Sequence, residues 1–200
     1  TAIGHVALDK ILVGQNIQHG DILIGVESNG VHSNGLSLAR SAFFEMNNYK
    51  ISHRFEELSS DIGSELLRPT HIYVKEALEL IEEVSSLKAL VHITSDGFLN
   101  LARVKAEVGY VIDKLPPIPP IFSIIQRLAH VDETEMFSVY NMGIGFCAIV
   151  SPAEADKTLE ILSRRGKRAY PIGHAVSDTA RRVKLTKQNL VGEGKRYSYD

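Results

Sequence analysis

The sequence predicts an α/β fold, more fully an α+β fold in which helices flank a mixed β-sheet. Single apolar runs with strand character alternate with amphipathic helical segments along most of the chain. The 200 residues are 44% hydrophobic, so they can form a core that buries roughly 70% of the unfolded surface. The chain shows no internal repeat and no low-complexity tract. Its length fits one large domain, or one domain with appended pieces.

Two segments near the start, "TAIGHVA" and "ILVGQNI", have the β-branched composition of short strands. Because the chain opens without methionine and enters these segments almost at once, we expect residues 1–18 to be boundary strands that follow a further domain. Residues 19–200 then form the domain itself, starting with a buried strand over 20–26. The spacing of the next apolar residues predicts a helix, with Ser33 or Asn34 as its N-cap. The apolar face of that helix consists of Leu36, Ala39, Phe43 and Met46.

The remaining elements alternate in the same way. A second helix starts at Thr70, its predicted cap, and places Ile72, Ala77, Leu80, Ile81 and Val84 inward. A later helix over 151–166 combines a Ser151 cap with Glu154 in a capping box. Further strands are expected at 89–94, 109–115, 141–150, 168–176 and 181–186, with helices at 99–105 and 121–129, the latter after the rigid link 116–120.

Composition excludes several classes of protein. The formal net charge is −2, which gives no general attraction to nucleic acid or to membrane surfaces. No segment reaches the roughly 18 apolar residues of a membrane span. The lone cysteine, Cys147, cannot form an internal disulfide, so we expect a core residue in a reducing, cytoplasmic protein. Basic residues gather at 164–168 and 181–187, either as solvated surface or as a phosphate-facing surface.

Three loops share a pattern of small polar residues and glycine at a strand end: "SNGVHSNG" (28–35), "TSDG" (94–97) and "NMGIG" (141–145). Glycine and asparagine tolerate positive φ, so backbone N–H groups in such loops can converge on an anion. The first loop also leads into a helix N-terminus. Within it, His32 either donates a hydrogen bond to a substrate oxygen or orders the turn. His71 and His92 are expected to be packed and hydrogen-bonded.

Other site signatures are absent from the sequence. It lacks CxxC, HxH and HExxH, so no metal site is predicted in this chain. It also lacks GxxxxGK[ST], GxGxxG and a nucleophile elbow. Nucleotide-triphosphate hydrolysis by this chain alone is therefore not supported.

In order along the chain, "GDILIGVESNGVHSNGLSLAR", "PTHIYVK", "ALVHIT", "PPIPPIF" and "EMFSVYNMGIGF" resemble the C-terminal half of aminoimidazole ribonucleotide synthetase, also called phosphoribosylformylglycinamidine cyclo-ligase. The resemblance covers roughly residues 1 to 176. It implies a mixed sheet flanked by helices and partly ferredoxin-like. It also implies a reaction of purine biosynthesis, in which ATP activates the formyl amide oxygen of formylglycinamidine ribonucleotide. An internal nitrogen then closes the imidazole ring of aminoimidazole ribonucleotide.

The resemblance further implies the residues of the site. His32 and Asn34 match catalytic positions in the first loop. The implied substrate-binding residues are Ser28, Asn29, Gly30, Ser33, Gly35, Thr94, Asp96, Gly97, Asn141, Met142 and Gly143. The second loop departs from the family's Thr-Gly-Gly-Gly, because Ser95 and Asp96 replace glycines. An Asp facing a phosphate would repel it, so Asp96 turns away, binds a cation or marks an altered substrate preference.

The family's N-terminal half, which is implied to form the homodimer and to hold most of the ATP and Mg²⁺ contacts, has no counterpart in these 200 residues. The chain is then either a fragment cut at the domain boundary, which its start favours, or the product of a split gene, and it is expected to be inactive alone. Its implied partners are the phosphorylated ribonucleotide and its own N-terminal half, with no nucleic acid and no membrane. Two alternatives remain open: a stand-alone binding or regulatory module for a phosphorylated nucleotide precursor, and half of a related ATP-dependent phosphotransferase.

Overall fold

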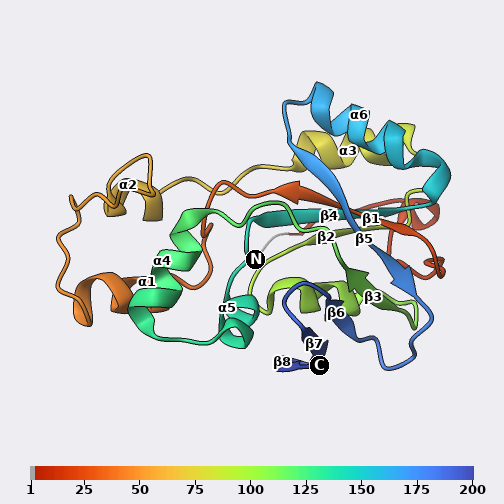
Figure 1. Ribbon diagram of the computed structural model, residues 1–200. Coiled ribbons are helices and arrows are strands. Elements are labelled where there is room, and N and C mark those ends of the chain that lie inside the picture. Colours follow the sequence, from red (N-terminus) through yellow and green to blue (C-terminus); the bar gives the residue numbers. More distant parts are fainter. Residues whose placement is uncertain (1–2) are drawn as a thin grey trace.

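The computed structural model describes residues 3–200 and is built around an eight-stranded mixed β-sheet (Figure 1). The strand order is β2-β4-β1-β5-β3-β6-β7-β8. Strands β3 and β6 pair in parallel, and the other recorded pairs are antiparallel. The strands are β1 Ile22–Glu27, β2 Ala89–His92, β3 Gly109–Ile112, β4 Ile144–Val150, β5 Ala169–Val176, β6 Val183–Leu185, β7 Leu190–Glu193 and β8 Arg196–Tyr199. The α/β prediction with a mixed sheet is confirmed.

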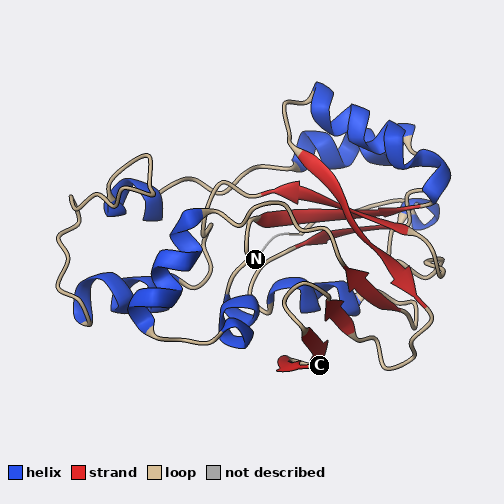
Figure 2. Ribbon diagram, in the orientation of Figure 1, coloured by secondary structure: helices blue, strands red, loops and turns tan. Residues whose placement is uncertain are grey.

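Helices and single turns lie on both sides of this sheet (Figure 2). The α-helices are α1 Leu36–Arg40, α2 Ile62–Leu66, α3 Val74–Glu83, α4 Pro120–Ala129, α5 Glu133–Val139 and α6 Ala155–Arg164. The 3₁₀ turns are η1 Leu8–Lys10, η3 Gly97–Arg103 and η4 Pro152–Glu154, and η2 Ser41–Glu45 is a π-helical turn. No helix of the described residues is long and apolar enough to cross a membrane.

Half of the sheet is ferredoxin-like, as the resemblance implied. The units β1-α3-β2 and β4-α6-β5 interleave to give the antiparallel order β2-β4-β1-β5. Helices α3 and α6 lie side by side on one face of this half (Figure 1). Every residue of the inner strand β4 is buried, including Cys147, which is a core residue as predicted.

The structure corrects the prediction for the start of the chain. The predicted boundary strands do not form within residues 3–18, where η1 is the regular element, and Thr1 and Ala2 lie outside the described residues. A strand needs a hydrogen-bonding neighbour, and this segment joins no sheet. Most of its apolar side chains are exposed, with Ile3 at 95%, whereas Ile17 at its end is 5% exposed and joins the core.

The first helix is shorter than predicted and is capped differently. Gly35, with φ +71°, precedes α1, and neither Ser33 nor Asn34 caps it with its side chain. The Asn34 side chain instead accepts a hydrogen bond from Ser95. The helix continues into the π-helical turn, which leaves Met46 51% exposed rather than in the predicted apolar face.

Two further predictions of helix structure are wrong. Helix α3 begins at Val74 with no side-chain cap from Thr70, and Ile72 and Ile81 are exposed, whereas Leu80 and Val84 are buried as expected. The predicted capping box at the later helix does not form either. Glu154 accepts hydrogen bonds from the Ser86 backbone N–H and the Ser85 hydroxyl, and Ser151 makes no side-chain cap.

Candidate functional site

Asn141 joins the first and third of the predicted loops. Its Oδ1 accepts hydrogen bonds from the Ser28 hydroxyl and from the Gly143 backbone N–H, both at 2.8 Å. Its Nδ2 donates to the Gly30 carbonyl oxygen at 2.9 Å. The side chain is 1% exposed, so its buried hydrogen bonds link the first loop to the third.

The second loop reaches the first through one hydrogen bond, in which the Ser95 hydroxyl donates to Asn34 Oδ1 at 3.2 Å. Asp96 lies in the left-handed region with φ +72°, and its Oδ2 is 2.6 Å from the Arg103 guanidinium. The carboxylate is thus neutralised by a residue of its own turn η3. Three alternatives were open for Asp96: it turns away from a phosphate, binds a cation or marks an altered substrate preference. The ion pair with Arg103 matches the first of these.

Two glycines in these loops are required by close contacts. A Cβ on Gly97, where φ is +54°, would lie 2.1 Å from the Phe137 carbonyl oxygen. A Cβ on Gly143, where φ is +98°, would lie 2.7 Å from Pro119 Cδ. Gly97 and Gly143 are therefore required for packing, whether or not they contact a ligand. Met142, between Asn141 and Gly143, also has a positive φ, +48°, an uncommon conformation for a residue with a Cβ.

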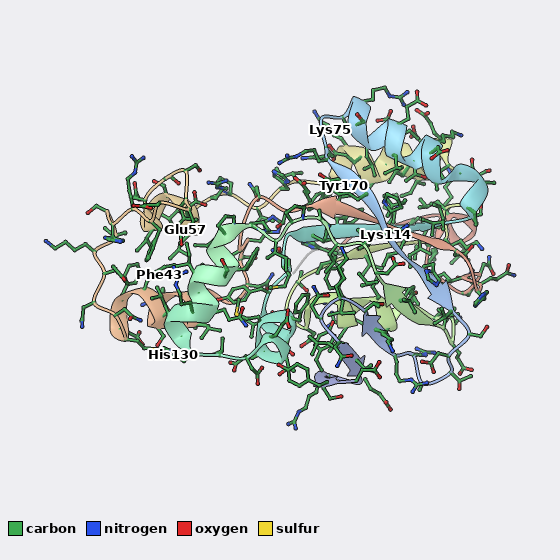
Figure 3. The ribbon with its side chains drawn as sticks, in the orientation of Figure 1. Phe43, Glu57, Lys75, Lys114, His130 and Tyr170 are labelled. Atoms are coloured by element: carbon green, nitrogen blue, oxygen red, sulfur yellow. The ribbon has the colours of Figure 1, made fainter. Side chains whose placement is uncertain are left out.

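A groove of about 770 Å³ opens beside the first and third loops. It runs from the sheet to the outlying helices, with Tyr170 on the sheet side and Glu57 on the α2 side (Figure 3). Its lining consists of Glu27, Ser28, Asn29, Gly30, Glu57, Leu58, Ser59, Glu65, Arg68, His71, Pro117, Pro119, Pro120, Ile121, Gly143, Gly166, Lys167, Arg168 and Tyr170.

The groove brings together part of the predicted site. Ser28, Asn29, Gly30 and Gly143 line it. The other predicted residues do not line it, namely His32, Ser33, Asn34, Gly35, Thr94, Asp96, Gly97, Asn141 and Met142. Their catalytic and substrate-binding roles stay predictions.

His32 is buried beneath the first loop, with 5% of its surface exposed and φ +57°. Its Nε2 accepts a long hydrogen bond, 3.5 Å, from the Asn29 backbone N–H. Burial, and then the nearby His71 and His92, lower the pKa of His32 to about 4. The imidazole is therefore neutral at pH 7 and contacts the turn through Asn29, and its role toward a substrate stays a prediction.

The other two histidines differ from each other. His71 lines the groove, and its Nδ1 lies 3.3 Å from the Glu27 carbonyl oxygen, in keeping with the expected packed histidine. His92 is exposed at the end of β2, so the expectation of a packed side chain is wrong there. Among the described residues, no group of three His, Cys, Asp or Glu side chains could hold a metal ion.

The basic run at 164–168 divides between two surroundings. Arg164 and Arg165 pair with Glu79 on α3, while Lys167 and Arg168 line the groove. The first part thus supports helix packing, and the second part matches the phosphate-facing alternative.

Acidic partners restrain the two arginines of the groove. Arg168 Nε lies 2.8 Å from Glu27 Oε2, and Arg68 pairs with the buried Glu65 at 2.6 Å. Lys167 instead lies over the Tyr73 ring, with its Nζ 5.6 Å from the ring centroid, and no carboxylate is within ion-pair distance of it among the described residues. Lys167 is therefore the cation of the groove most available to a ligand. The basic run at 164–168 could be found in the sequence. Only the tertiary structure shows that Lys167 in this run lacks an acidic partner, whereas Arg168 has one.

The fold is that of a domain shared by several solved enzymes. The thiamine-monophosphate kinase of Stenotrophomonas maltophilia K279a superposes with a TM-score of 0.58 at 19% identity, over 90% of this chain and 54% of that chain. The phosphoribosylformylglycinamidine synthase II of Thermotoga maritima superposes with a TM-score of 0.52 at 14% identity, over 92% and 26%. At such identities the likeness establishes the fold alone.

The family follows from sequence comparison. The model of the AIR synthase related protein, C-terminal domain, matches residues 18–186, and the chain belongs to this family. The phosphoribosylformylglycinamidine cyclo-ligase of Methanothermobacter thermautotrophicus is 48% identical over 185 residues, which are 92% of this chain and 53% of the relative. The phosphoribosylformylglycinamidine cyclo-ligase of Methanocaldococcus jannaschii is 42% identical over 177 residues, which are 88% of this chain and 50% of the relative. The resemblance is thus confirmed, and the chain spans about half the length of these relatives.

Asn141→Ala is expected to lower the free energy of unfolding by about 2 kcal/mol, because the Gly143 N–H and the Gly30 carbonyl lose a buried partner. Urea unfolding measures this loss. Ser138→Ala, which removes a part-buried hydrogen bond to the Thr134 carbonyl on α5, serves as the control and should cost less than half as much. Equal losses would show that Asn141 does not fasten the loops.

Proposed function

We propose that this chain is the C-terminal, substrate-groove half of an ATP-dependent cyclo-ligase of purine biosynthesis. The complete enzyme converts formylglycinamidine ribonucleotide to aminoimidazole ribonucleotide and forms a C–N bond. The observation that carries the proposal is the identity of 42–48% with cyclo-ligases over most of this chain. The boundary after residue 18, a cytoplasmic location and a homodimer of the complete enzyme belong to the same proposal.

The reaction divides between the two halves. ATP and Mg²⁺ would be held mainly by the N-terminal half, where ATP would supply the phosphoryl group that activates the formyl amide oxygen. ADP would leave on that transfer, and phosphate would leave when the ring closes. This half holds the ribonucleotide in the groove, where Ser28, Asn29 and Gly30 are among the lining residues. Asn34, which does not line the groove of this chain, is proposed to reach the amide by hydrogen bonding in the complete enzyme, and neutral His32 to hold the loop in the required conformation. The chain alone is inactive because the activating phosphoryl donor is absent from its own site.

Calorimetric titration tests this division. The chain is expected to bind formylglycinamidine ribonucleotide and not ATP–Mg²⁺, and to form no product from the two together. Product formation by this chain alone, or tight ATP binding, would overturn the proposal and favour a phosphotransferase. Specific binding of a different phosphorylated precursor, with no gain of activity when an N-terminal half is added, would favour a stand-alone binding module.

Lys167→Ala is expected to weaken ribonucleotide binding by tenfold or more, because it removes the groove's most available cation from a phosphorylated ligand. Titration of the variant measures the change in Kd. Lys195→Ala removes an exposed lysine away from the groove and should leave the Kd unchanged. Equal effects of the two variants would indicate general charge attraction rather than a phosphate contact at Lys167.

A further inference from the structure

Helix α3 exposes an apolar stripe that no described residue covers. Val74, Leu78 and Ile81 are 60%, 56% and 41% exposed, and Ile72 just before the helix is 75% exposed. At 3.6 residues per turn, positions 74, 78 and 81 share one side of a helix. An unbroken apolar row of this kind on a helix indicates a surface that another element covers.

The stripe faces a defined direction. Tyr73, Leu80 and Val84 of the helix segment pack into the core above β4, and Glu79 and Glu83 face Arg164 of α6. The positions of the stripe lie on the flank opposite these two glutamates. Helix α6 contacts β1 and β5, and β2 is the edge strand on the other side of β4. The stripe therefore faces away from α6, toward the β2 edge.

Strand β2 adds an open edge to the same flank. Within the part of the chain that the structure describes, β2 pairs with β4 alone. An unpaired strand edge offers backbone donors and acceptors to another chain segment. The stripe and this edge together, called here the α3–β2 flank, combine apolar side chains with free backbone groups.

The two ends of the α3–β2 flank adjoin the start of the chain and the groove. At one end, a hollow is lined by Ile11 and Leu12 together with residues 85–88, so the start of the chain lies against the end of α3. At the other end, Ile72 adjoins His71 on the groove wall. A body joined ahead of the first residues and seated on this flank would extend to the open side of the groove.

We propose that the α3–β2 flank docks the N-terminal half of the same enzyme. The inference rests on the proposed function. This chain matches about half of each relative, so a part of comparable size lies outside the match and can occupy the flank. Its apolar surface meets the stripe, and one of its strands or loops pairs with the β2 edge. Binding there completes the groove beside His71.

The test measures assembly instead of activity. The probe is the N-terminal half of the Methanothermobacter thermautotrophicus relative, supplied as a separate chain and titrated by calorimetry with this chain. Leu78→Glu with Ile81→Glu is expected to weaken the association at least 100-fold. Leu67→Glu, at a 78% exposed residue off the flank, is the matched control and should bind like the unchanged chain. Circular dichroism melts confirm beforehand that the N-terminal half, this chain and its variants are each folded.

Unchanged binding by the double variant would overturn the proposal, as would no binding by the unchanged chain. Sedimentation of this chain alone provides a further test, because self-association abolished by Leu78→Glu would assign the flank to a second copy. The readout separates this inference from the proposed function. If the two halves associate through the flank but form no aminoimidazole ribonucleotide, the docking surface is supported and the proposed cyclo-ligase function is overturned.

Discussion

Lys88→Met is expected to lower the free energy of unfolding by about 3–5 kcal/mol, because it leaves a buried carboxylate without its cation. Lys88 Nζ lies 2.7 Å from both Oδ atoms of Asp21, whose side chain is 4% exposed. Asp21 also accepts a hydrogen bond from the Gln18 backbone N–H, so its position is held from a second side. Equilibrium unfolding in urea at pH 7 measures the loss.

Two further variants test whether the loss of stability comes from the unpaired buried charge of Asp21 or only from the lost ion-pair contact. Arg127→Met breaks the exposed pair with Glu57, at 3.2 Å, and should cost less than about 1 kcal/mol. The combined Asp21→Asn and Lys88→Met variant should recover most of the stability, since no unpaired charge then remains. A loss below about 1 kcal/mol for Lys88→Met alone would contradict the argument and indicate that water reaches Asp21.

This ion pair shows what kind of information the sequence lacks. Strands β1 and β2, which follow directly after Asp21 and Lys88, could be predicted because each is a short run of mostly apolar residues. Nothing local connects Asp21 with Lys88, 67 positions away. The short strands β7 and β8 were missed for a related reason, because four residues of mixed polarity become a strand only by pairing with a neighbour.

The short helices α2 and α5 were also missed, although the sequence contains their start signals. Asp61 Oδ1 accepts from the Ser64 backbone N–H, and Asp132 Oδ1 from that of Glu135, each at 2.9 Å. Helices of five and seven residues are too short to show a clear apolar period. Capping residues without a following apolar period did not suffice to predict them.

The candidate site also has features that could be predicted from local sequence and features that depend on contacts between distant segments. Glycine content identified the loops, because Gly30, Gly35, Gly97 and Gly143 adopt the positive φ that glycine tolerates, and this is a local property. Which loop residues line the groove depends on contacts between distant segments, such as the hydrogen bonds of Asn141 to Ser28 and Gly30. The pairing of Asp96 with Arg103, seven positions later in the same turn, was closer to being predictable.

Acidification is expected to cost the fold about 3 kcal/mol through His32 alone. Its pKa is about 4 in the folded protein, against 6.5 for an ordinary histidine, and each pKa unit corresponds to about 1.4 kcal/mol. Between these two values the unfolded chain binds more protons than the folded one, so stability falls as the pH falls. The contribution of His32 is fully present above pH 6.5 and is lost progressively down to pH 4.

The matched test replaces His32 by asparagine, which tolerates the positive φ but does not titrate in this range. Urea unfolding at a series of pH values should show a shallower loss for His32→Asn than for the unchanged chain between pH 6.5 and 4. His130→Asn, at an exposed histidine with φ +53°, should keep the steeper loss. Burial also lowers the pKa of His71, beside the same loop, so part of the pH dependence should survive in His32→Asn. Parallel curves for His32→Asn and the unchanged chain would mean that the imidazole is solvated and free to act on a substrate, the other role that the sequence allowed.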